Sequence, residues 1–209
     1  MSILVLTSDT LSSPAAVGQI EYSSPIFAGT PIGTQRGIVP TQQYYRLDSS
    51  LAGANSTSAQ NIFGVGVTLS SSTVYEFEMN VVFTKSAGTT SHTFGFGFAG
   101  TATLNNILYL SNAVAIASST SGGGIGTTCY GSFATTASNS TTNLQTTSAA
   151  VTWAVILKGT VSVNAGGTFI PQYTLTAAPG GAYSTVAGSY IRINPLSASG
   201  AATNVGTWA

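Results

Sequence analysis

Hydrophobic and polar residues alternate strictly along residues 73–83, which read TVYEFEMNVVF. In an extended chain, one side of this segment carries only apolar residues, namely Tyr75, Phe77, Met79, Val81 and Phe83. The other side carries Glu76, Glu78 and Asn80. A period of two is typical of a half-buried β-strand, whereas a helix would mix the two sets. The pattern therefore predicts a strand with one face in a core and one face in water, as in an antiparallel sandwich.

Residues 91–100, SHTFGFGFAG, repeat this alternation with aromatic residues on one side and glycines on the other. The aromatic side carries His92, Phe94, Phe96 and Phe98. Because residues 85–90 form a short, turn-rich connection, we expect this strand to form an antiparallel hairpin with residues 73–83, with both aromatic faces on the same side. The bare glycine face would allow another backbone or sheet to pack very close to it.

A second long strand is predicted over residues 151–163, VTWAVILKGTVSV. Residues 164–167 then predict a turn, and residues 169–176 its hairpin partner, in which Pro171 requires an edge or bulge position. Shorter strands are expected at residues 18–22, 44–47, 62–69, 103–111, 127–136, 144–147 and 189–195. Residues 49–59 and 113–126 are expected to be loops. No segment has a sustained helical period, so the predicted fold is all-β, a jelly-roll-like antiparallel β-sandwich, with a barrel as the alternative.

Residues 1–40 differ in character from the rest of the chain, because they hold four of the seven prolines. Proline fixes φ and lacks a backbone donor, so we expect an extended N-terminal arm that runs over a surface, with residues 3–6 and 18–22 as short edge strands. An independent fold is not expected there. The predicted domains are this arm, residues 1–40, and the β-sandwich, residues 41–209.

Charged residues make up 5% of the 209 residues, against about 25% in an ordinary soluble domain. The formal net charge is zero, which gives little protection against association. This composition favours a protein that works inside an assembly, with a secreted domain as the alternative. Five Lys and Arg residues form no basic stripe, which argues against nucleic-acid binding. The start MSILVLTSDT lacks the basic region of a signal peptide, and no stretch is long enough for a transmembrane helix.

Candidate chemistry is sparse. A Ser-His-Asp triad would have to use His92, the only histidine, which is better interpreted as a strand-end residue near the rim of the core. Glu76 and Glu78 have a separation compatible with a glycosidase pair, but a solvated strand face and a guard against edge pairing explain them as well. Cys129 is alone and is expected to be a small buried hydrophobe. We therefore predict no catalytic residue, no cofactor-binding residue and no metal ligand, and a protein that is not an enzyme.

Several motifs, in this order along the chain, resemble those of tailed-bacteriophage virion proteins. They are Gly18-Gln-Ile-Glu-Tyr22, Gln35-Arg-Gly-Ile-Val-Pro40 leading into Gln43-Tyr-Tyr-Arg-Leu47, Phe94-Gly-Phe-Gly-Phe-Ala-Gly-Thr101, Lys158-Gly-Thr-Val161 and Asn204-Val-Gly-Thr-Trp208. The resemblance is to capsid decoration or cement proteins and to the distal domains of tail fibres. It implies a homotrimeric β-sandwich. The chain begins almost directly at the arm, without a tail-attachment domain or coiled coil, which favours a decoration protein.

Composition and resemblance together predict a structural virion protein, a capsid decoration (cement) protein on the capsid surface of a tailed phage. Its expected partners are two further copies of itself, in a homotrimer, and the major capsid protein, with no nucleic acid and no membrane. The alternative is a receptor-binding tail-fibre tip that recognises host surface glycans. A third hypothesis, a glycan hydrolase that uses Glu76 and Glu78, predicts an activity that a Glu78→Gln change would abolish.

Overall fold

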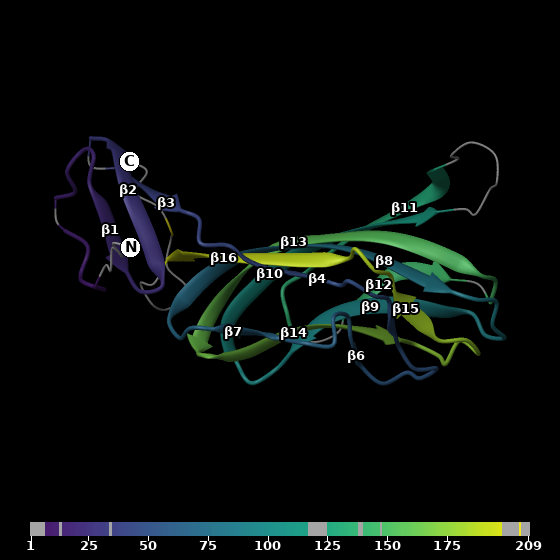
Figure 1. The fold of residues 1–209 in the computed structure, drawn as a ribbon. Helices are drawn as coiled ribbons and strands as arrows, with labels where there is room; N and C mark the ends of the chain where they lie inside the picture. The colour runs from purple at the N-terminus through teal and green to yellow at the C-terminus, as the bar shows by residue number, and fades with distance from the viewer. Residues whose placement is uncertain are drawn as a thin grey trace.

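A computed structural model describes residues 7–12, 14–33, 35–116, 125–137, 140–146, 148–197 and 205, with side chains described except at 116, 125–130 and 140–146. All regular structure within these residues is β-strand, and every pair of strands is antiparallel. The strands form two stacked sheets, with a small third sheet at one end of the molecule (Figure 1). The all-β class and the antiparallel sandwich are thus confirmed, whereas the jelly-roll connectivity and the trimer remain predictions.

The larger sheet of the sandwich has eight strands. They are β4 (Gln43–Arg46), β5 (Leu51–Ala52), β8 (Thr73–Lys85), β10 (Thr103–Ile116), β11 (Ile125–Ala134), β13 (Val151–Ala165), β15 (Tyr183–Thr185) and β16 (Tyr190–Ser197). β8 lies in the middle, with β13 along one side and β16 followed by β15 along the other. The predicted strands at residues 73–83 and 151–163 are therefore present and longer than expected.

The second sheet has five strands. They are β6 (Gln60–Asn61), β7 (Val67–Leu69), β9 (His92–Ala99), β12 (Ser140–Thr146) and β14 (Gly167–Leu175). The single strand expected over residues 62–69 is wrong, because this stretch holds only β7 and a non-strand segment before it. A Cβ on Gly66 would lie 2.6 Å from Cγ1 of Ile170, so this glycine allows the segment before β7 to approach β14 closely. Residues 113–116 belong to β10, not to the expected loop, and residues 117–124 lie outside the described part.

The core forms where β8 and β9 face each other across the sandwich. Phe83 lies 5.0 Å from Phe94 and Phe77 lies 5.1 Å from Phe98, measured between ring centroids. The predicted hairpin of these two strands is therefore wrong, because β8 pairs with β13 and β16 while β9 pairs with β12 and β14. Two aromatic faces bury each other when their strands lie in opposite sheets. In a hairpin, both faces would need a third element to cover them.

The second predicted hairpin is also wrong, since β13 pairs with β8 and β10 and β14 belongs to the other sheet. The chain crosses between the sheets at Gly166 and Gly167. A Cβ on Gly167 would lie 2.6 Å from the backbone nitrogen of Ala102, so this crossing passes very close to a neighbouring loop. Pro171 lies on a strand flanked on both sides, at the gap between the partners β6 and β7. Its missing N–H falls in that gap, so Pro171 interrupts one ladder without making β14 an edge strand.

The N-terminal region forms a sheet of its own. β1 (Ile20–Ser23), β2 (Ile26–Ile32) and β3 (Gln35–Val39) pair only with one another, and Figure 1 shows them at one end of the sandwich. The expected extended arm is therefore corrected to a three-stranded sheet over residues 20–39. The cause is that the prolines occupy tolerated places, with Pro25 in the turn between β1 and β2 and Pro40 after β3. The strand expected at residues 3–6 lies outside the described residues, and the division at residue 40 remains a prediction.

Candidate functional site

Glu78 lies at the centre of a row of charged side chains on the outer face of the larger sheet. Its Oε2 atom is 2.8 Å from Nζ of Lys158 on β13 and 3.0 Å from Nη2 of Arg192 on β16. The hydrogen bond from Lys158 lowers the pKa of Glu78 below its usual value, and Arg192 adds to this effect. A glycosidase acid needs the opposite shift, a raised pKa, so Glu78 is unsuited to that role. The edge-guarding interpretation of Glu76 and Glu78 is also wrong, because β8 is a central strand.

Replacing Glu78 with glutamine is expected to lower the free energy of unfolding by about 1 kcal/mol, because two cations lose their shared carboxylate. The loss should be smaller at about 1 M salt than at about 0.05 M salt, since salt screens ion pairs of exposed side chains. Thermal unfolding of the purified protein at both salt concentrations measures it. Glu76→Gln is the matched control, on the same strand face but exposed, and should change stability less. An equal loss in the control would contradict the role of the charged row.

His92 is buried at the start of β9, which confirms its interpretation as a strand-end residue at the rim of the core. Its Nδ1 donates to the carbonyl oxygen of Thr90 at 3.0 Å, so Nε2 accepts from the hydroxyl of Tyr183 at 2.8 Å. Burial lowers the pKa of His92 below its usual value. Both ring nitrogens of a neutral imidazole are thus engaged in structural hydrogen bonds, which does not fit a general base for a serine.

The lowered pKa of His92 predicts that the protein becomes less stable as the pH falls below about 6.5, the ordinary histidine pKa. The unfolded chain then binds a proton that the folded chain resists, because the ring is buried and the charge of Lys85 is nearby. Stability from neutral His92 is complete above that pH and is lost as the pH decreases toward the folded pKa. Urea unfolding at pH 7.5 and pH 5.5 measures this. A His92→Gln variant should lose the difference, and an unchanged difference would contradict the assignment.

Lys85 is the one buried lysine among the described residues. Its ammonium donates to the carbonyl oxygens of Ser86, Ser148 and Ala149 at 3.0, 3.2 and 2.8 Å. Burial lowers the pKa of Lys85. These contacts join the connection after β8 to the connection before β13, so we interpret Lys85 as a structural tie between two loops.

Side-chain groups that could bind a metal and helices that could span a membrane were sought in the described residues. No group of three or more His, Cys, Asp and Glu side chains gathers there as a metal would require. Nor does the described part include a helix with the length and hydrophobicity needed to cross a membrane. The side chain of Cys129 lies outside the described part, so its expected burial stays a prediction.

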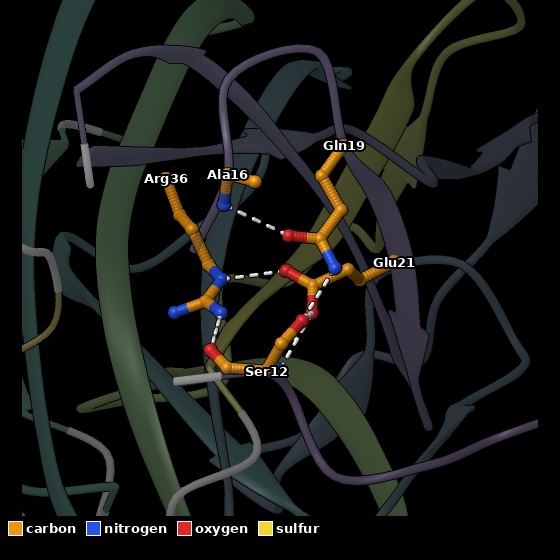
Figure 2. Close-up of polar contacts among 5 residues, drawn as sticks. All are labelled: Ser12, Ala16, Gln19, Glu21 and Arg36. Atoms are coloured by element: carbon orange, nitrogen blue, oxygen red, sulfur yellow. Dashed lines mark hydrogen bonds and ion pairs between the residues drawn. The ribbon is translucent and has the colours of Figure 1, made fainter. Parts of the chain in front are cut away.

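The N-terminal sheet is held to the residues before it by a polar cluster around Glu21, which Figure 2 shows. Glu21 makes an ion pair with Arg36 at 2.7 Å and accepts hydrogen bonds from the backbone N–H and the hydroxyl of Ser12. The side chain of Gln19 contacts Ser12 and also accepts from the backbone N–H of Ala16 at 2.9 Å. Arg36 and Ser12 lower the pKa of Glu21 to about 2. The cluster acts as a clamp that fastens Ser12 and Ala16 to the sheet.

The outer face of the larger sheet carries exposed apolar side chains on β10, β11 and β13, which we call the outer patch. Its members are Leu108, Leu110, Phe133 and Ile156. Phe133 is 70% exposed and lies directly across from Leu110, which is 55% exposed. On its other side Leu110 pairs with Lys158, so the outer patch continues into the charged row around Glu78.

Sequence reasoning missed the outer patch, although a signal was available. Residues 107–110, Ile-Leu-Tyr-Leu, are an uninterrupted apolar run within a strand. Ile107 and Tyr109 point into the core, which leaves Leu108 and Leu110 on the other face. A strand that is apolar on both faces indicates that each face packs against other protein surface.

A groove of about 360 Å³ lies where the two sheets of the sandwich part, between β4 and β7. Tyr45 of β4 lies on one wall and Val67 of β7 on the other, and buried core residues such as Ile193 and Phe169 lie beneath. None of the lining residues carries a charge; they are Gln43, Tyr44, Tyr45, Phe63, Val65, Gly66, Val67, Thr68, Phe169, Pro171, Ile191 and Ile193. The arrangement is suited to burying an uncharged, extended segment, and its lining residues include no carboxylate, histidine or lysine.

No model of a known protein family matches the chain, and no curated protein matches it. Among solved structures, the chain is similar to a chain in the structure of the infectious bursal disease virus Gx strain, with 12% sequence identity and a TM-score of 0.18. The match covers 84% of this chain and 46% of the viral chain, so this chain spans less than half of the viral chain's length. A TM-score this low does not establish a common fold, and the proposals below rest on the residues of this chain.

Proposed function

We propose that the chain is a structural virion protein without enzymatic activity, a decoration (cement) protein on the capsid surface of a tailed phage. In this proposal it is a homotrimer and binds the major capsid protein, and it contacts neither nucleic acid nor membrane. The observation that carries the proposal is the outer patch, a group of exposed apolar side chains beside the charged row on the outer face of the larger sheet. The order of the phage-like motifs along the chain supports a tailed phage as the particle to which the protein belongs.

The outer patch favours burial against another protein for a physical reason. Contiguous exposed apolar surface rimmed by polar residues marks interaction sites, because covering it releases water at no cost in unpaired polar groups. The rim here is the charged row of Lys158, Glu78 and Arg192. The carboxylate of Glu78 already makes ion pairs with the other two side chains. A cement protein needs such surfaces and no chemistry, since it stabilises a shell by adding buried area between subunits.

Copy number on the particle tests the proposal. Virions of the phage that encodes the chain would be purified, and the protein would be quantified against the major capsid protein by mass spectrometry with labelled standard peptides. Hundreds of copies per particle are expected for a cement protein. A handful of copies would contradict a decoration role and favour a tail-fibre tip, and absence from the particle would contradict both.

The second candidate, a receptor-binding tip that recognises host glycans, is favoured by one observation. Tyr44 is 55% exposed and stacks on Tyr190 with a centroid distance of 5.3 Å, on the same face as Arg192. Exposed aromatic rings beside hydrogen-bonding side chains are a surface on which sugar rings bind. A Tyr44→Ala variant should then lose binding to host surface polysaccharide, whereas a cement protein would show none to lose.

A further inference from the structure

The groove between β4 and β7 lies between two strand edges that face each other. Among the described strands, β4 pairs with β16 alone and β7 with β14 alone, so each has one edge without a strand partner. Such edges present rows of backbone donors and acceptors, and an added strand satisfies them. The apolar floor below them, which includes Ile191 and Phe63, would be covered at the same time.

A second cavity, of about 390 Å³, leads from this groove to the small N-terminal sheet. It shares Gln43 and Thr68 with the groove and is also lined by Pro25, in the turn between β1 and β2. The second cavity therefore lies next to the groove, on the side toward the N-terminal sheet.

Residues 8 and 9 lie at this same corner of the N-terminal sheet. The N–H of Asp9 donates to the carbonyl of Tyr22 at 3.0 Å, and the N–H of Ser24 donates to the hydroxyl of Ser8 at 2.8 Å. Residues 8–9 thus run antiparallel to β1, and toward its N-terminus the chain passes Ser24 beside Pro25. Residues 1–6 precede this part of the chain, and six extended residues span about 20 Å.

We propose that residues 3–6 of the same chain occupy the groove as an added strand along β4 or β7. Their sequence, Ile-Leu-Val-Leu, is apolar, uncharged and half β-branched, which suits a groove whose lining residues carry no charge. The segment has four residues, as β4 has, and both span about 13 Å when extended. The added strand closes the one side of the sandwich where the core residues Ile191, Ile193 and Phe169 border a groove. This proposal does not depend on the proposed function.

Hydrogen–deuterium exchange of the full chain tests the added strand. Alternate residues of a strand face opposite sides, so one of two matched double variants, Ile3→Asp with Val5→Asp or Leu4→Asp with Leu6→Asp, places its charges in the groove. That variant should speed amide exchange in residues 43–46 and 67–69 at least tenfold, and the other should do so far less. Equal effects of the two variants, or no effect of either, would overturn the proposal.

Two further measurements keep the test decisive. Exchange in β13, at the centre of the sandwich, should not change; if a variant speeds it as well, the chain lacking residues 1–6 is used instead, with a synthetic Ser-Ile-Leu-Val-Leu-Thr peptide as the probe. The peptide should restore slow exchange in residues 43–46 or 67–69, and failure to do so overturns the proposal.

In the full chain, slow exchange should persist on hundredfold dilution. Its loss on dilution would assign the groove to a second copy and would overturn the assignment to the same chain.

Discussion

Replacing Phe83 with alanine is expected to lower the free energy of unfolding by about 3–5 kcal/mol, the largest effect of any single change considered for this protein. Phe83 is fully buried on β8 and packs between the two sheets. Its ring lies 5.0 Å from Phe94 and 5.3 Å from Tyr173, measured between centroids. Truncation would leave a cavity that those rigid rings cannot fill. Thermal unfolding should show a midpoint lower by on the order of 10 °C for a domain of this size.

Phe133→Ala is the matched control for this experiment. The same ring is removed, but Phe133 is on the outer patch and exposed, so the free energy of unfolding of the isolated protein should change by less than about 0.5 kcal/mol. Equal losses for the two variants would contradict the placement of Phe83 in the core and of Phe133 on the surface.

If the chain is the proposed cement protein, deleting residues 1–40 is expected to abolish its attachment to the capsid while leaving a folded trimer. The deletion removes β1, β2 and β3, which pair only with one another, and leaves every strand that the structure describes in the two larger sheets, since β4 begins at Gln43. The lost sheet has an exposed apolar face that includes Ile20, which is 71% exposed, and Val39. Sedimentation of the truncated protein with particles that lack it measures attachment, and light scattering after size exclusion measures the trimer.

An Ile20→Asp variant separates loss of the apolar face from loss of the whole segment. Ile20 is exposed beside two glycines of the neighbouring strands, so the aspartate should leave the sheet folded while weakening attachment. If the truncated protein still coats particles as the full chain does, the N-terminal sheet is not the attachment element. If the truncated chain attaches but fails to form trimers, the sheet acts between subunits.

Alternation along the chain was enough to locate the main strands and to say which residues face the core. In residues 73–83 every residue predicted to point inward is buried, and the same is true of Phe94, Phe96 and Phe98. The reason is local, because the side-chain period of two is a property of the extended backbone. Strand partners were not predicted correctly, because a period of two does not say whether two apolar faces lie side by side or face each other.

For the candidate site residues too, the sequence predicted the local environment but not the partners. The sequence placed His92 near the rim of the core, where it is buried, and a solvated strand face explained Glu78 as well as a glycosidase pair did. It did not show that Lys158 and Arg192 would come to Glu78 from strands 80 and 114 positions later in the chain. Nor did it show the clamp around Glu21 or the groove between β4 and β7, because each joins segments that only sheet register brings together.

The alternation over residues 73–83 determined by itself that this segment is a strand and that Phe77 and Phe83 belong to a core. The lack of a sustained helical period in the rest of the sequence predicted that the protein is all-β. The tertiary structure decided that this strand is central, that its aromatic face meets β9 across the sandwich, and that the proline-rich start folds into a sheet. The physical reason is the distance along the chain over which each effect acts. Side-chain alternation acts between neighbours in sequence, whereas the choice of partner depends on loop crossings, such as that at Gly167, and on which pair of apolar faces excludes the most water.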